Sequence, residues 1–378
     1  MLDPENIERL RTLMDARMKE EVGLLDELRG EMEEFKRGIR RIKSFPVNTV
    51  SIVGTDGGNN NLAFDPFVIH VIRIVDSNGV EYYMDVLTPS IPIEELENKI
   101  ADRGNSLRRM MDFLGVSSLR ELSPMIGGRK PGSATWIQTY RELVEWATLF
   151  SLVRDHDYGS DTLIVFDGLL RSKVFSKDLF KRLRDGIEQA ILEKERKNRF
   201  HIYIVGVAKH SKVIDRYNLV MCTDNVMKTN YPCYGRVPHE MEEKSYVWSE
   251  YARDDTAVEG VTEANKFVAG KMFLVKFGNS PHDPIWPVDI FLPQEKDSDR
   301  ILGFLLNDAI EGFPIPFYPM CLQKAHENSA LVDFDMDIIQ GQMIDSIRKS
   351  MAGSEERFDA FLMTDRDIAE RRYGKGLK

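Results

Sequence analysis

The chain has 378 residues, of which 42% are hydrophobic and 30% are charged, and its formal net charge is −10. This composition is typical of a soluble globular protein with one large core or two smaller ones, and it argues against a generally basic nucleic-acid-binding surface. No apolar window approaches the roughly 18–20 residues of a membrane span, and the first residues are too polar for a secretory signal, so we expect a cytoplasmic protein. The three cysteines have neither zinc-site spacing nor an even count, so we expect ordinary thiols.

The N-terminal segment is helical in pattern. Residues 4–42 are rich in Leu, Met, Glu, Lys and Arg, with apolar residues at helical spacing, which predicts one long helix or two consecutive ones before Pro46. Its apolar stripe must be buried either on the body of the protein or in a second subunit. The stripe begins with Ile7, Leu10, Leu13 and Met14.

The next part of the chain alternates strands and helices. Strand patterns are followed by helical ones in the order βββαβαβ, with a tight turn at 76–79. Three antiparallel strands followed by crossover helices and parallel strands predict an α/β fold: a mixed sheet with helices on both faces, in the order of the ribonuclease H-like fold. The expected strands are about 48–55, 67–75, 80–87, 162–166 and the run from 201, and the main helices start near 133–135 and 176.

The last third of the chain is less regular and reads as an α+β elaboration. It contains strand patterns at 270–278 and 286–293, a helix at 298–310 and a proline-punctuated entry into a further helix. The expected divisions are a helical segment at 1–45, a main domain at 46–345 with its core at about 46–215 and a C-terminal part at about 265–345, and a helix with a basic tail at 346–378.

Two apolar strands of this pattern end in aspartate followed by glycine. Asp56 follows the first strand and Asp167 the fourth, and these two strands are parallel neighbours in the predicted sheet, so their carboxyl ends lie side by side. Two adjacent carboxylates beside an apolar core repel each other unless a cation separates them, and Mg²⁺ and Mn²⁺ take such oxygen ligands. The alternative is that each aspartate simply caps a turn; the matched positions favour the metal site.

The helix that precedes the fourth strand must cross the sheet close to these acids. It carries Glu142 and Glu145, which are three residues apart and so roughly on one side. Glu145 is embedded among apolar neighbours and is the better candidate for a third ligand, with Glu142 as the alternative. An exposed helix glutamate is the common case, so neither residue is a specific signal by itself.

Basic residues follow the same strands and predict a track for phosphate groups. Arg171 and Lys173 come just after Asp167, and Lys209 and Lys212 come just after the fifth strand, at the same edge of the sheet. Each could equally belong to a solvated surface. Further basic residues on preceding loops are Arg108, Arg109, Arg129 and Lys130.

Together these motifs resemble those of the NurA nucleases over about residues 45–345. The resemblance is carried by "DGG", "EWA", "VFDGLLRSK", "VGVAKHSK" and "FYPMCLQKAHENSAL". It implies a ribonuclease H-like nuclease core that binds Mn²⁺ or Mg²⁺, with two ions, through acids in these motifs and completes the site with a C-terminal tyrosine and histidine. In this chain the implied residues are Asp56, Glu145, Asp167, Tyr318 and His326. Without the resemblance, His326 could be a surface helix histidine, and Tyr318 could be a core residue or a phosphate contact.

The resemblance also implies a function. It suggests a DNA nuclease with 5′-to-3′ exonuclease and single-strand endonuclease activity in DNA end resection and double-strand break repair, acting as a homodimer with a HerA-type hexameric ATPase translocase. No separate sequence feature indicates the polarity or the partner. An actin- or sugar-kinase-like phosphotransferase would explain "GTDGGNNN" as a phosphate loop, but it needs a duplicated core that is not found. A non-catalytic DNA-binding scaffold of the same fold would have no need of the retained acids and histidine.

Overall fold

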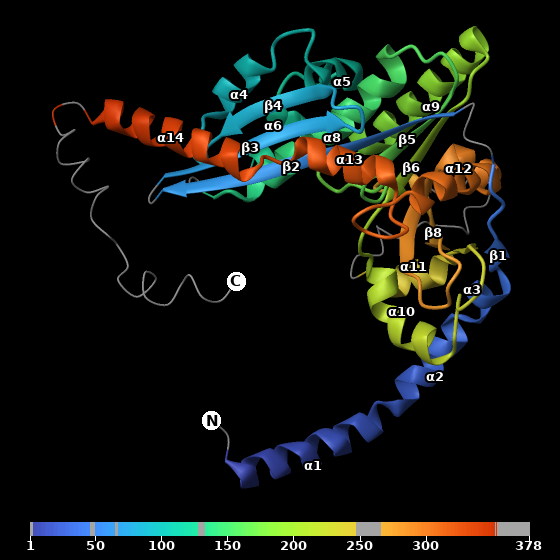
Figure 1. Ribbon diagram of the computed structural model, residues 1–378. Helices are drawn as coiled ribbons and strands as arrows, with labels where there is room; N and C mark the ends of the chain where they lie inside the picture. Colours follow the sequence, from blue (N-terminus) through green and yellow to red (C-terminus); the bar gives the residue numbers. More distant parts are fainter. Residues whose placement is uncertain are drawn as a thin grey trace. The chain divides into compact units, whose positions relative to one another are not determined.

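The computed structural model describes residues 3–45, 50–64, 67–127, 133–246, 266–351 and 353, and for some of these, Asp56 among them, only the backbone. Over these residues the strands form one mixed sheet, in the order β1-β7-β8-β9-β6-β5-β2-β3-β4 (Figure 1). Met1–Asn59 and Ile69–Ala330 form one compact unit, and Asn60–Val68 with Leu331–Lys378 a second. None of the described helices is long and apolar enough to cross a membrane.

The secondary structure follows the expected alternation. The strands are β1 (Arg40–Arg41), β2 (Val50–Phe64), β3 (Phe67–Asp76), β4 (Glu81–Leu87), β5 (Asp161–Asp167), β6 (Ile202–Val207), β7 (Cys233–Arg236), β8 (Gly270–Lys276) and β9 (Ile285–Phe291). The helices are α1 (Pro4–Glu20), α2 (Val22–Glu31), α3 (Glu33–Arg37), α4 (Ile93–Lys99), α5 (Ser106–Leu114), α6 (Leu119–Leu122), α7 (Pro124–Gly127), α8 (Thr135–Asp155), α9 (Leu179–Asn198), α10 (Lys212–Thr223), α11 (His239–Ser245), the 3₁₀ helix η3 (Leu292–Asp297), α12 (Ser298–Ile310), α13 (Met320–Ser329) and α14 (Asp333–Ser350).

Five strands form the predicted ribonuclease H-like core. β3 and β4 are antiparallel, β2 lies between β3 and β5, and β5 is parallel to both β2 and β6. This gives the order β4-β3-β2-β5-β6, which confirms the βββαβαβ expectation. Beyond β6 the sheet continues through the antiparallel strands β9 and β8, which supply the C-terminal elaboration.

The two faces of the central strands bury different cores. Ile164 and Phe166 of β5 face the core that contains α5, α8 and α9, where the Phe166 ring lies 5.1 Å from that of Trp146. Leu163 and Val165 face the opposite core, which contains α12 and α13. Because side chains alternate along a strand, the odd-numbered residues of β5 belong to the α13 face.

β2 is longer than the sequence predicted. We expected the first strand at about 48–55 and the second to begin at 67, but β2 continues to Phe64. Its ladder with β5 ends at the pair Thr55–Phe166, while β3 remains its neighbour on the other side. Because β2 and β3 are hydrogen-bonded neighbours, β3 supplies partners for the backbone groups of this stretch, so polar composition did not decide the conformation.

The N-terminal segment divides into an exposed half and a buried half. The apolar stripe of α1 is exposed, with Ile7 at 52% and Leu13 at 57% of their accessible surface. Leu28, Met32 and Phe35 are instead buried in a core formed with α10 and β8. The end of the segment therefore packs on the protein's own core, and the α1 stripe, together with Leu24 of α2, remains available for a partner.

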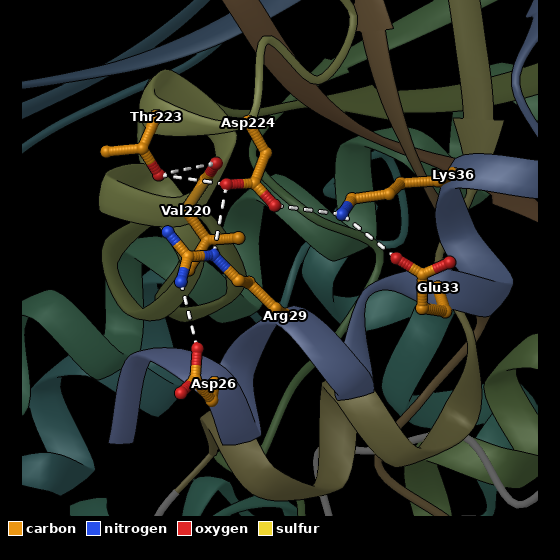
Figure 2. Close-up of polar contacts among 7 residues, drawn as sticks. All are labelled: Asp26, Arg29, Glu33, Lys36, Val220, Thr223 and Asp224. Atoms are coloured by element: carbon orange, nitrogen blue, oxygen red, sulfur yellow. Dashed lines mark hydrogen bonds and ion pairs between the residues drawn. The ribbon is translucent and has the colours of Figure 1, made fainter. Parts of the chain in front are cut away.

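Polar contacts also hold α2 and α3 on α10. Figure 2 shows Asp224, the residue after α10, between Arg29 of α2 and Lys36 of α3, with N–O distances of 3.2 and 3.0 Å. Arg29 also donates to Asp26, and Lys36 to Glu33. These side chains are partly exposed and rim the buried contact of Leu28, Met32 and Phe35.

Candidate functional site

Asp167 lies at the carboxyl end of β5, at the point where its ladder with β2 ends. It pairs with Val207 of β6, and the preceding residue, Phe166, pairs with Thr55. The register therefore places position 56 of β2 beside position 167, which agrees with the predicted juxtaposition of the two strands. The side chain of Asp56 lies outside the described part of the chain, so its role remains a prediction.

Tyr318 reaches this strand end from the C-terminal part of the chain. Its ring is buried, and its hydroxyl donates a hydrogen bond of 2.9 Å to Asp167 Oδ1. The edge of the Trp286 ring packs on it, with centroids 4.9 Å apart. Phe317, directly before it, has φ +57°, a conformation that non-glycine residues rarely adopt, so the backbone that presents Tyr318 is held in an unusual shape.

The start of α13 packs directly on β2, two residues before Asp56. A side chain at Gly54 would place its Cβ 2.6 Å from the carbonyl of Cys321, closer than any real contact. Only glycine allows this approach, which brings α13 across the same sheet face as Asp167. The other end of α13 is fixed to β3, because Arg73 donates to the carbonyl of Asn328.

Both candidate glutamates lie on α8, and they make different contacts. Glu145 is 3.3 Å from Arg141, one turn earlier in the helix, and its side chain is 16% exposed. Glu142 accepts a hydrogen bond of 2.6 Å from the hydroxyl of Ser172, which lies on the segment that follows Asp167. Burial raises the pKa of Glu142, and the Ser172 hydrogen bond opposes this rise. Glu142 is thus tied to the strand end that carries Asp167, and the choice of ligand between the two remains open.

The remaining candidates on the α13 side lie at the surface. His326 is exposed on α13. Lys209 is also exposed, and its ammonium lies 5.5 Å from the centre of the Tyr318 ring, which places a positive charge beside the Tyr318–Asp167 pair. Lys212 starts α10 and lies 3.8 Å from Asp215.

On the other side of the strand end, Lys173 lies 5.6 Å from the centre of the Phe267 ring. Arg129 and Lys130 fall outside the described residues.

Arg171 does not lie on a surface that DNA could contact. Its side chain is 3% exposed, and its guanidinium contacts Asp289 at 2.9 Å and Glu242 at 2.7 Å, both of them fully buried. Because its side chain is buried, Arg171 does not make the phosphate contact that the sequence predicted. The signal was Asp289 itself, since an acid inside the apolar strand pattern at 286–293 needs a buried cation as its partner.

The ligand set expected for a metal is only partly described. Within the described residues, no group of three or more His, Cys, Asp or Glu side chains could hold a metal ion. This statement does not cover Asp56, whose side chain is outside the described part of the structure. The carboxylates of Asp167 and of the α8 glutamates have the chemistry that hard divalent ions prefer, but by themselves they do not complete a site.

Fold and site define an α/β protein with a ribonuclease H-like sheet and an acid, Asp167, at the carboxyl end of a strand that is parallel to β2. The chain is similar to the crystal structure of the NurA nuclease from Sulfolobus solfataricus, with 14% identity and a TM-score of 0.43 over 93% of this chain and 99% of that one. It is also similar to a NurA with manganese, at 12% identity and a TM-score of 0.40 over 90% of this chain and 98% of that one.

A third similar structure is a NurA bound to dAMP and manganese, at 12% identity and a TM-score of 0.33 over 88% of this chain and 94% of that one. No family model matches the chain, and no curated protein matches it. Because the identities and TM-scores are low, the function has to be argued from this chain's own side chains.

Proposed function

We propose that this chain is a divalent-metal-dependent deoxyribonuclease, a hydrolase of DNA phosphodiester bonds. The observation that carries the proposal is the hydrogen bond from Tyr318 to Asp167, which joins residues 151 positions apart at the end of the β2–β5 ladder. The ammonium of Lys209 lies 5.5 Å from the centre of the same tyrosine ring, so a hydroxyl donor, a carboxylate and a positive charge lie near this strand end. Such a combination is suited to binding a phosphate and a cation together.

The proposed ligands for Mn²⁺ or Mg²⁺, as two ions, are Asp56, Glu145, Asp167 and His326, with Glu142 as the alternative to Glu145. Bound divalent ions would lower the pKa of an attacking water and stabilise the leaving oxygen. The other roles belong to the chain itself. Tyr318 orients the Asp167 carboxylate by its hydrogen bond, and Lys209 with Lys173 binds phosphates on either side of the strand end.

The finer parts of the proposal rest on the sequence resemblance. They are 5′-to-3′ exonuclease and single-strand endonuclease activity, a role in end resection and double-strand break repair, a homodimer, and a HerA-type translocase as partner. The exposed stripe of α1 supports the presence of a partner surface, because apolar side chains in a helical row are usually covered.

The test is cleavage of linear DNA by the purified protein with Mn²⁺, with Mg²⁺ and with excess chelator, beside an ATP hydrolysis assay. We expect cleavage only with metal and no ATP hydrolysis. Asp167→Asn should reduce cleavage to background, and Tyr318→Phe should cost about tenfold, the value of one hydrogen bond to a charged group. Asp178→Asn, an exposed acid at the start of α9 without a side-chain capping bond, is the matched control and should behave as the wild type.

Full cleavage in chelator would rule out the metal-dependent reading. ATP hydrolysis without DNA cleavage would favour the phosphotransferase, and metal-independent DNA binding without any cleavage would favour the scaffold.

A further inference from the structure

Arg171 occupies a buried site that the proposed chemistry does not use. Its Nε and Nη2 donate to the two carboxylate oxygens of Asp289 at 2.9 and 3.0 Å, and its Nη1 donates to Glu242 at 2.7 Å. The guanidinium also lies 5.5 Å from the centre of the Tyr246 ring. Desolvating three charges is costly, so a cluster of this kind marks a place where the geometry of the chain is specified closely.

The same cluster fixes the backbone of the segment 168–172. Asp289 accepts a third hydrogen bond, from the backbone N–H of Leu170 at 3.0 Å. The carbonyl of Leu170 accepts from Ala269 at 2.8 Å, and the N–H of Ser172 donates to Phe267 at 2.9 Å. The segment is therefore held by side chain and backbone at once.

This segment connects Asp167 to Glu142, the alternative α8 ligand of the candidate site. It starts immediately after Asp167, and it ends at Ser172, whose hydroxyl donates to Glu142. At its start, the N–H of Gly168 donates to Val207 at 2.9 Å, and a Cβ at Gly206 would lie 2.4 Å from the Gly168 carbonyl. The Gly168 carbonyl is thus packed closely against β6, so a shift of the segment would move Asp167 and Glu142 relative to each other.

We propose that Arg171 is a positioning residue for the acids of this site: through Asp289 and Glu242 it holds the segment 168–172 in place. The inference rests on the proposed nuclease function. In this role Arg171, the arginine of "VFDGLLRSK", holds the acids of the site at fixed relative positions and does not bind phosphate. A planar guanidinium can donate to two carboxylates in fixed directions, which an ammonium cannot.

The test compares Arg171→Lys with the wild type. Lysine keeps the positive charge, so we expect a folded protein, but its ammonium cannot make the paired bonds to Asp289 and the bond to Glu242 together. We expect kcat to fall by about 10- to 100-fold, with KM for DNA unchanged, because a small misplacement of catalytic groups is costly. Hydrogen exchange of the amides in 168–172 should become faster, since Leu170 loses its fixed acceptor.

The matched control is Arg216→Lys. Arg216 of α10 donates to the carboxylate of Glu31, whose side chain is 3% exposed, and within the described residues it makes no hydrogen bond to the segment 168–172 or to the acids of the site. Its replacement should lower thermal stability and leave kcat and the exchange of 168–172 as in the wild type. Should Arg171→Lys fail to fold, Asp289→Asn removes one of the paired oxygen acceptors and should give the same fall in kcat.

Two results would overturn the inference. If the folded Arg171→Lys protein had the kcat and the hydrogen exchange rates of the wild type, Arg171 would only stabilise the fold. If its KM for DNA rose while kcat stayed constant, Arg171 would instead contribute to DNA binding. A wild-type protein without nuclease activity would refute the proposed function instead. In that case the exchange rates alone would still decide whether Arg171 fixes the segment.

Discussion

Two ion clusters in this protein join distant parts of the chain, and they differ in burial. Around Arg171, the side chains of Arg171, Glu242 and Asp289 are 3%, 0% and 0% exposed. Around Asp224 (Figure 2), the side chains of Arg29, Lys36 and Asp224 are 43%, 25% and 20% exposed. The N–O distances are similar. The buried cluster pairs one cation with two carboxylates and the exposed cluster pairs two cations with one carboxylate, and the two clusters differ clearly in their access to water.

The difference shows that an ion pair's role follows from its surroundings. In the buried cluster each charge has lost its hydration, and it is tolerated only because its partner is in place. Burial raises the pKa of Glu242, and Arg171 opposes the rise. In the exposed cluster water and salt can replace any partner, and the apolar contacts of Leu28, Met32 and Phe35 hold the helices together.

The largest expected effect is that of Arg171→Met. It leaves the carboxylates of Asp289 and Glu242 buried without their guanidinium, so the free energy of unfolding should fall by about 3–5 kcal/mol. Urea unfolding followed by circular dichroism measures this.

The double variant Arg171→Met/Glu242→Gln sharpens the same comparison. It removes one charge of each sign, so its loss should be smaller than the sum of the two single losses by about 0.5–3 kcal/mol. Strict additivity would mean that the cluster does not act as a unit.

A smaller effect on the free energy of unfolding is expected from protonation of His70, a buried side chain that has no charged partner among the described residues. His70 lies on β3 at 5% exposure, and neither ring nitrogen has a hydrogen-bond partner among the residues that the structure describes. Burial lowers the pKa of His70. The unfolded chain therefore takes up a proton before the folded one does, so stability is complete above the ordinary histidine pKa of about 6.5 and falls as the pH drops below it.

The measurement is the free energy of unfolding of the wild type and of His70→Leu between neutral and mildly acidic pH. The wild type should lose up to about 1.4 kcal/mol per pH unit relative to the variant. Parallel pH profiles for the two proteins would show that His70 is not kept neutral by the fold.

The sequence predicted the parts of this fold that depend on local pattern. The apolar run of β5 that ends in Asp167, and the βββαβαβ order, follow from strand periodicity and from the rules for crossovers. The same pattern predicted the part of the site that these strands position, namely the neighbouring backbone positions 56 and 167. Tyr318 entered through the family resemblance, and the structure places its hydroxyl on Asp167.

The parts that sequence could not supply depend on distant partners. The Gly- and Asn-rich stretch after Asp56 is typical of a loop, yet it belongs to β2 because β3 is beside it. Arg171 looked like a phosphate ligand because Asp289, which buries its charge, is 118 residues away. In the N-terminal segment, the sequence pattern predicted one apolar stripe with one kind of partner along its whole length. In the structure, only the second half of this stripe packs against α10.

The smallest expected effect belongs to Asp224→Asn in the exposed cluster. The hydrogen bond from Lys36 lowers the pKa of Asp224, so its contribution is present above the ordinary aspartate pKa of about 3.9 and is lost as the pH falls below it. At neutral pH and low ionic strength the variant should be only slightly less stable than the wild type. The difference should vanish near about 1 M salt, where the screening length is about 3 Å. Phe35→Ala is the matched variant in the same contact; Phe35 is fully buried, and its loss should cost about 3–5 kcal/mol at any salt concentration. If urea unfolding gave the two variants similar losses, or if the loss at Asp224 survived high salt, burial would not be what distinguishes the two ion clusters.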